Sequence, residues 1–220
     1  MPMKPQVAAH ALNKLLADDA IVVSDCGTVT TWAARHLEMR DRMQFSVSGS
    51  LATMACGLPY AVGASVAYPG RQVVAIVGDG GFTMLMGEIA TMVKYNLPVK
   101  VMVIKNNVLG EIKWEQMVLE GNPQFGVQLQ PIDFAAYARA CGAGGFTLDD
   151  PARADAVLRQ AFDHPGPVVI EAVVDPNEPP LPGKISTQQA LHFAESLVRG
   201  QKDRFGIIKT VLRDKVREVV

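Results

Sequence analysis

The sequence predicts an α/β fold: a doubly wound, largely parallel sheet with helices on both faces. Short apolar runs alternate along the chain with longer segments of helical periodicity, which is the pattern of βαβ units. Two of these runs, at 72–77 and 99–104, lead directly into glycine and polar residues. In doubly wound sheets, such residues lie at the carboxyl ends of the strands, where ligands bind.

The first half of the chain follows this pattern element by element. Residues 5–17 carry apolar side chains at helical spacing and predict the first helix. The segment 57–67 is rich in small residues, which allows a helix to pack closely on a sheet. Further helices are expected at 28–37 and 84–95, and strands at 21–24, 72–77 and 99–104.

The second half continues the alternation and then changes character. Asp133 is placed to cap a helix that runs to Cys141. The segment 175–182 contains four prolines, which predicts an extended linker. Further helices are expected at 110–120, 152–162, 187–198 and 205–219, and strands at 145–148 and 167–174.

The composition excludes several classes of function. The chain has 220 residues, of which 49% are hydrophobic and 20% charged, as in ordinary globular proteins. The formal net charge is −1, so no nucleic acid is expected as a partner. The three cysteines have neither metal-binding nor disulfide spacing, which favours a reducing cytoplasm. No apolar run reaches the length needed to span a membrane.

Two strand ends form the most informative pattern. The first run ends in the sequence GDGG, residues 78–81, and the second ends in KNN, residues 105–107. The spacing leaves room for a helix and a second parallel strand between them. A carboxylate and an amide oxygen at such strand ends, beside a glycine turn and a helix start, suit a divalent cation that carries a phosphate.

These motifs resemble the diphosphate-binding domain of thiamine diphosphate-dependent enzymes, whose signature is GDG followed at a distance by NN. Within that family the resemblance is closest to pyruvate oxidase and quinone-dependent pyruvate dehydrogenase, and it extends over nearly the whole chain. Residues 25–35 resemble the start of the family's domain, and residues 51–59 resemble the family segment that seats the cofactor rings. Residues 97–100 and 108–110 resemble the stretches that frame the second metal ligand in the family.

The resemblance implies thiamine diphosphate and Mg²⁺ as cofactors. The implied metal ligands are the carboxylate of Asp79, the amide oxygen of Asn106 and the backbone carbonyl of Val108. The NN doublet lies one position later than in the family, so a gap-free alignment makes Asn106 the ligand and leaves Lys105 as a solvated side chain. An inserted residue in the strand would make Asn107 the ligand instead, but it would also turn the following side chains to the opposite face.

The same resemblance implies the rest of the site. Gly80 and Gly81 would let backbone N–H groups approach the diphosphate, with a helix beginning after Phe82. Met54 would lie beneath the cofactor and force it to bend, and the carbonyl of Ala52 would accept from the 4′-amino group. The full set of expected cofactor-binding residues is Thr28, Val29, Thr30, Ala52, Thr53, Met54, Asp79, Gly80, Gly81, Asn106, Val108, Leu109, Gly110 and Ile112. For the threonines, simple helix capping is the alternative.

By resemblance, the chain is the diphosphate-binding part of an enzyme that decarboxylates a 2-oxo acid such as pyruvate. The activating Glu of the family comes from a pyrimidine-binding domain of the same or another chain, so no catalytic residue is identified here and the isolated chain is expected to be inactive. The resemblance also implies a homo-oligomer, dimer or tetramer, and allows FAD in a full-length enzyme. The alternatives are acetolactate synthase, a simple decarboxylase, or the cofactor-binding subunit of a split enzyme.

Residues 1–182, which include the linker at 175–182, are expected to form the thiamine diphosphate-binding domain, and 183–220 a helical tail. The apolar face expected for the last helix consists of Phe205, Ile208, Leu212, Val216 and Val219. The helix is also basic, so it could lie on an anionic membrane surface. We expect it to pack on protein instead, because its few charges and apolar residues are unexceptional.

Overall fold

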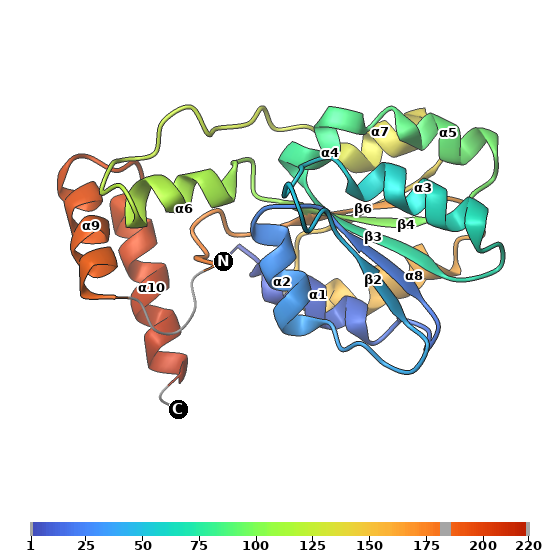
Figure 1. Ribbon diagram of the computed structural model, residues 1–220, viewed down its shortest axis with the longest axis horizontal. Helices are drawn as coiled ribbons and strands as arrows, with labels where there is room; N and C mark the ends of the chain where they lie inside the picture. The colour runs from blue at the N-terminus through green and yellow to red at the C-terminus, as the bar shows by residue number, and fades with distance from the viewer. Residues whose placement is uncertain (1, 181–185, 219–220) are drawn as a thin grey trace. The chain divides into compact units, whose positions relative to one another are not determined.

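The computed structural model describes residues 2–180 and 186–218, with 215–218 described by their backbone alone. The described residues form two compact units (Figure 1). The first contains the residues up to 106 together with 131–174, and the second contains 107–130 together with the residues from 175 onward. The boundary expected between residues 182 and 183 lies outside the described residues.

The first unit is built on a parallel sheet. Its described residues form six strands in the order β2-β1-β3-β4-β6-β5, and each neighbouring pair is parallel. This confirms the predicted α/β fold. The strands are β1 (Ile21–Ser24), β2 (Gln44–Ser46), β3 (Val73–Gly78), β4 (Lys100–Lys105), β5 (Gly144–Leu148) and β6 (Val168–Val173).

Helices cover both faces of this sheet, so its central strands are apolar without alternation. In β3, Val74 and Ile76 face one helical layer, whereas Ala75 and Val77 face the other. The first layer consists of α1 (Pro5–Asn13), α2 (Thr28–His36) and α8 (Ala154–Asp163). The second consists of α3 (Gly57–Ala67), α4 (Asp79–Leu85), α5 (Glu88–Lys94) and α7 (Phe134–Ala140).

The sequence-based expectations differ from this unit in several places. The helix expected at 84–95 is two helices, α4 and α5, which are separated at Gly87, the poorest helix former of the segment. The edge strand β2 was not expected, because its three residues are polar or exposed. A short 3₁₀ helix, Pro151–Arg153, precedes α8. The cap at Asp133 is confirmed, since its carboxylate accepts from the Ala136 N–H at 2.7 Å.

The second unit contains α6 (Gly110–Val118), α9 (Thr187–Val198) and α10 (Arg204–Glu218). Trp114 and Met117 of α6 pack with Ile207 of α10, so the last helix packs on protein within this unit. The face expected for that contact is wrong: Phe205 is 74% exposed and Leu212 is 59% exposed, whereas Ile207 is fully buried. The side chains of Val216 and Val219 lie outside the described part of the chain.

Candidate functional site

The carboxyl ends of three neighbouring strands bring the main polar residues of the first unit together. Asp25 follows β1, Asp79 follows β3, and Asn106 lies one residue beyond the end of β4. Gly78 pairs with Ile104 in the ladder between β3 and β4, so Asp79 and Asn106 leave adjacent strands at almost the same level. The sheet therefore places the two expected oxygen ligands together at the carboxyl ends of its strands.

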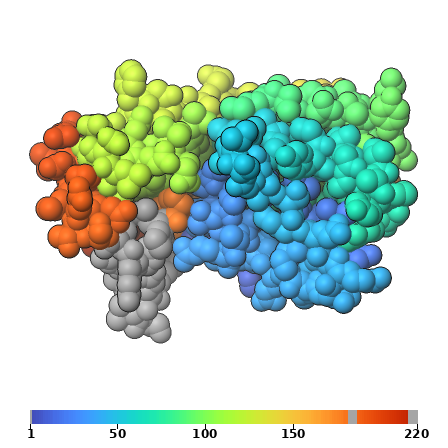
Figure 2. Space-filling model, in the orientation of Figure 1, coloured from blue at the N-terminus to red at the C-terminus, as the bar shows by residue number. Residues whose placement is uncertain are grey.

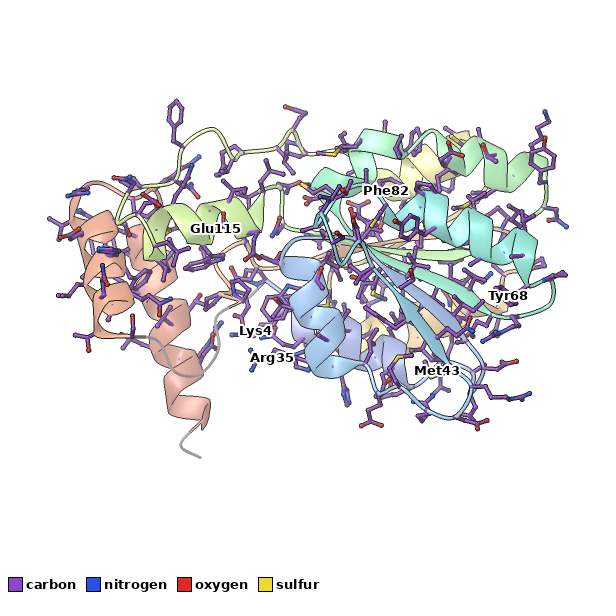
Figure 3. All side chains as sticks on the ribbon, in the orientation of Figure 1. Lys4, Arg35, Met43, Tyr68, Phe82 and Glu115 are labelled. Atoms are coloured by element: carbon purple, nitrogen blue, oxygen red, sulfur yellow. The ribbon has the colours of Figure 1, made fainter. Side chains whose placement is uncertain are left out.

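The turn at Asp79 is the first turn of a helix. Gly78 is the N-cap in an extended conformation, and α4 begins at Asp79 rather than after Phe82, as was expected. Asp79 is only 4% exposed, and its Oδ1 accepts from the N–H of Gly80 at 3.1 Å. Phe82 (labelled in Figure 3) is buried and packs edge-on against Phe134, with the ring centroids 5.1 Å apart. This contact packs the first turn of α4 against α7.

Gly81 has a packing reason for lacking a side chain. A Cβ at this position would come within 1.7 Å of Asp25 Oδ2 and within 2.8 Å of Asp25 Cγ. The space beside Gly81 is thus filled by a carboxyl group of the protein itself. Sequence reasoning assigned this glycine only to phosphate approach and did not find its contact with Asp25.

The start of α2 offers open space for a ligand. Its N-cap, Gly27, has a φ of 119°, and no atom lies within 4 Å of where its Cβ would be. The hydroxyl of Thr30 donates to the Asp25 carbonyl at 2.7 Å, so that hydroxyl is engaged within the protein. The side chain of Val29 is buried in the core, which leaves its backbone as the only part that could face a ligand. Thr28 is half-buried at the first position of the helix.

The segment 51–55 carries unusual backbone conformations. Ala52 has a φ of 48° and Ala55 a φ of 70°, both in the left-handed region that L-residues rarely adopt. Ser48 ties the segment down, because its carbonyl accepts from the Ala52 N–H and its hydroxyl from the Thr53 N–H. Figure 2 shows light-blue atoms of this part of the chain at the surface, where Met54 is half-buried. Strained backbone of this kind persists only where the surroundings fix it, and it is frequent at functional sites.

The remaining expected residues belong to the second unit. Val108 is buried and forms an antiparallel bridge with Gln128, and the Leu109 N–H donates to the Val127 carbonyl at 2.8 Å. Gly110 begins α6, and Ile112 is 43% exposed on it. Asn107, immediately before them, has a φ of 57°.

Lys105 is not solvated, contrary to expectation. It is buried at the end of β4, where its ammonium group is paired with the carboxylate of Glu171 on β6 and also donates to the Ile132 carbonyl. The second carboxylate oxygen of Glu171 accepts from the Ala135 N–H at 3.2 Å. The pair satisfies both charges internally and joins two strands to the start of α7.

The first unit fits a diphosphate and its cation chemically. The oxygen ligands at the strand ends suit a hard divalent cation, and the start of α2, a type of helix terminus that binds phosphates, has open space beside Gly27. No group of three His, Cys, Asp or Glu side chains that could hold a metal occurs among the described residues. The expected magnesium ligands include only one side chain of these types, that of Asp79. Within the same described ranges, no helix is long and apolar enough to cross a membrane.

Comparison with known proteins agrees with this chemistry. The family model described as "Thiamine pyrophosphate enzyme, C-terminal TPP binding domain" matches residues 25–172. YdaP of Bacillus subtilis (strain 168), provisionally named a thiamine pyrophosphate-containing protein, is 43% identical over 198 residues, which cover 90% of this chain and 34% of that protein.

Two acetolactate synthases are also similar. The large subunit from Pyropia yezoensis is 36% identical over 187 residues, which cover 80% of this chain and 30% of that protein. The mitochondrial catalytic subunit from Saccharomyces cerevisiae (strain ATCC 204508 / S288c) is 33% identical over 208 residues, which cover 91% of this chain and 30% of that protein. The chain spans about a third of the length of these curated relatives.

Proposed function

The chain belongs to the thiamine pyrophosphate enzymes, as their C-terminal cofactor-binding domain, and we propose that it binds thiamine diphosphate (the same compound) through a Mg²⁺ ion. The proposed ligands are the Asp79 carboxylate, the Asn106 amide oxygen and the Val108 carbonyl. One carboxylate with neutral oxygen ligands suits Mg²⁺ that also binds the phosphates of its substrate or cofactor.

The observation that carries this proposal is the register of β3 and β4. Their ladder brings Asp79 and Asn106 to one edge of the sheet. The ladders of β4 with both of its neighbours run without interruption up to Ile104 and Lys105, so the strand contains none of the bulges that an inserted residue would produce. This supports Asn106, rather than Asn107, as the ligand.

The other residues of the proposed site have separate roles. The backbone N–H groups of Thr28, Gly80 and Gly81 would hold the diphosphate, and Met54 with the Ala52 carbonyl would hold the rings in a bent form. When bound, thiamine diphosphate supplies the carbon nucleophile and the electron sink for breaking the bond beside a keto group. The chain therefore binds and orients, and the group that activates the cofactor would come from a pyrimidine-binding domain.

The proposed reaction is decarboxylation of a 2-oxo acid, with pyruvate as the first substrate to test. The segment 25–35 supports a pyruvate oxidase-like reaction, in which electrons pass to a flavin or quinone. Acetolactate synthase is the second candidate, and the names of relatives that are 33% and 36% identical favour it. We propose a cytoplasmic homo-oligomer as the working form, with the pyrimidine-binding domain in the same or another chain.

Calorimetric titration of thiamine diphosphate into the 220-residue chain, with and without Mg²⁺, tests the metal site. Asp79→Ala and Asn106→Ala should each weaken Mg²⁺-dependent binding by at least about tenfold, since each removes a direct ligand. Asn107→Gly is the matched control, because glycine adopts the positive φ of this position without strain, and it should bind as the wild type does. If Asn107→Gly is damaging and Asn106→Ala is mild, the assignment of the amide ligand is wrong.

The products formed from pyruvate separate the two reactions. The chain should be mixed with a pyrimidine-binding domain from a relative, in the presence of Mg²⁺, the cofactor and an artificial electron acceptor. Acetate with reduction of the acceptor would support the oxidase-like reaction, whereas acetolactate without reduction would support the synthase.

A further inference from the structure

Three segments that are distant in the sequence meet at the carboxyl group of Asp25. Asp25 is fully buried at the end of β1, where its N–H donates to the Ile76 carbonyl of β3 at 3.0 Å. The other two segments are the end of the ring-seating segment, at Ala55 and Cys56, and the first turn of α4, at Gly81. A fully buried carboxyl group is uncommon and requires a specific set of neighbours.

The contact with α4 is a close steric fit. Asp25 Oδ2 occupies the place that a Cβ of residue 81 would need, and the Ala55 nitrogen would lie 3.4 Å from the same Cβ. Oδ2 has no hydrogen-bond partner of normal geometry among the described residues. This oxygen therefore acts mainly through its volume, which holds the turn of α4 and the segment 51–56 at a fixed separation.

The contact with the ring-seating segment is polar. The thiol of Cys56 has two acceptors, the Ser24 carbonyl at 3.6 Å and Asp25 Oδ1 at 3.7 Å. The backbone N–H groups of Ala55 and Cys56 are near enough to the carboxyl to lower its pKa. Ala55 is one of the two residues of the segment with a positive φ, a conformation that is costly for a residue with a side chain. The carboxyl thus holds the segment at the point where its backbone is strained.

The electrostatics agree with a positioning role. Burial raises the pKa of Asp25, and hydrogen bonds from the backbone N–H groups of Ala55, Cys26 and Cys56 offset only part of that effect. Burial also raises the pKa of the Cys56 thiol to about 11, so this thiol stays protonated and available as a donor.

We propose that Asp25 is a positioning residue, whose carboxyl fixes the segment 51–56 against the first turn of α4 and so sets Ala52 and Met54 relative to Asp79. Because Asp25 is fully buried, it acts through Ala55 and Gly81 and not by touching the cofactor. The effect on the cofactor rests on the proposed function, whereas the effect on the segment 51–56 does not.

Hydrogen exchange without cofactor tests the effect on the segment. In Asp25→Ala, exchange of the amides of 51–56 should rise at least about tenfold, because the segment loses its anchor. Leu158→Ala, which opens a cavity in the core on the other face of the sheet, should lower overall stability without this local effect. Asp25→Asn keeps the volume and one acceptor oxygen and should restore most of the protection. Unchanged exchange at 51–56 in Asp25→Ala would overturn the proposal.

A double-mutant cycle gives a second measurement, and its first step, Gly81→Ala, keeps Asp25 and so does not depend on Asp25→Ala folding fully. Gly81→Ala should displace the carboxyl, raise exchange at 51–56 and lower the urea midpoint. The same change should shift the midpoint much less in the Asp25→Ala background, where the clashing oxygen is gone. Additive effects of the two substitutions would contradict the proposed contact.

Titration with thiamine diphosphate and Mg²⁺ then connects the segment to the cofactor. Asp25→Ala should weaken binding at least about tenfold, while Asp25→Asn and Leu158→Ala should bind nearly as the wild type does. If the wild type itself binds no cofactor, the proposed function fails. If the wild type binds and Asp25→Ala binds equally well despite faster exchange, the positioning role fails alone.

Discussion

Lys105, at the end of β4, and Glu171 of β6 form a buried ion pair, with side-chain exposures of 10% and 4%. Such a pair contributes little compared with an apolar substitute, but removal of one partner leaves a charge buried and uncompensated. Lys105→Met should therefore lower the free energy of unfolding by about 3 to 5 kcal/mol. Urea denaturation followed by circular dichroism would measure this loss.

The double variant Lys105→Met/Glu171→Met provides the control for that experiment. It should recover most of the lost stability, because no charge then remains in the core. If the single and double variants are equally destabilised, the cost comes from packing and not from the unpaired carboxylate.

Lys113 predicts how the stability of the second unit depends on pH. It is buried on α6, donates to the Pro176 carbonyl at 2.8 Å and to Asn177 Oδ1 at 3.0 Å, and lies near Asp175 and Asp203. Burial lowers its pKa from 10.5 to about 8, although the two aspartates oppose that shift. Between these values the unfolded chain holds a proton that the folded chain has released, so the free energy of unfolding should rise with pH.

The expected rise between pH 8 and pH 10 is on the order of 2 kcal/mol. Fluorescence of Trp114, measured in a Trp32→Phe background, would follow the second unit alone. Lys113→Met should flatten the rise, whereas Lys202→Met, which removes an exposed lysine of the same unit, should not. A rise that is equally steep in Lys113→Met would assign the effect to another group.

At the scale of elements, α10 shows why periodicity identifies a helix more reliably than its buried face. The spacing of Phe205, Ile208 and Leu212 predicted the helix correctly, but Ile207 is the residue that packs on α6. Ile207 and Val211, which pack in the core of this unit, have the same helical spacing as the expected face. The choice between the two faces therefore depends on tertiary contacts that the local sequence does not contain.

Substitution on the two faces of α10 should separate them. Ile207→Ala should lower the free energy of unfolding of the second unit by about 2 to 5 kcal/mol, because it leaves a cavity beside Trp114. Leu212→Ala, on the exposed face, should change it by less than about 0.5 kcal/mol. Thermal unfolding followed by circular dichroism would test both, and a larger loss in Leu212→Ala would show that its face is covered in solution.

The same reasoning explains which elements could be predicted. The helix at 57–67 was predicted with its observed bounds, because its run of small residues is continuous. The strand β2 has no apolar signal, since it pairs at the edge of the sheet through its backbone. The strand ends at Asp79 and Asn106 were predictable from local motifs, whereas the contact of Asp25 with Gly81 joins distant positions and has no local signal.

For the whole molecule, the structure predicts association. Leu51, Met84 and Leu85 are 84%, 55% and 42% exposed, and they belong to the segments beside the proposed cofactor site. Exposed apolar residues of this kind favour contact with a partner. Analytical ultracentrifugation of the 220-residue chain should show self-association that increases with concentration, and Leu51→Ser/Met84→Ser should reduce it. A monomer at all concentrations would contradict this prediction.

The strand order has a consequence for how the chain acquires its fold during synthesis. β1, β3 and β4 can pair in the order in which they are made. Among the strands that the structure describes, however, β5 pairs only with β6, which is made after it. β5 is therefore made before its partner and stays unpaired until β6 inserts between β5 and β4. Parallel pairings of this kind close late and leave strand edges open in the meantime. A nascent chain that stops before β6 carries an exposed edge at β4 as well as an unpaired β5, and unpaired strand edges favour aggregation.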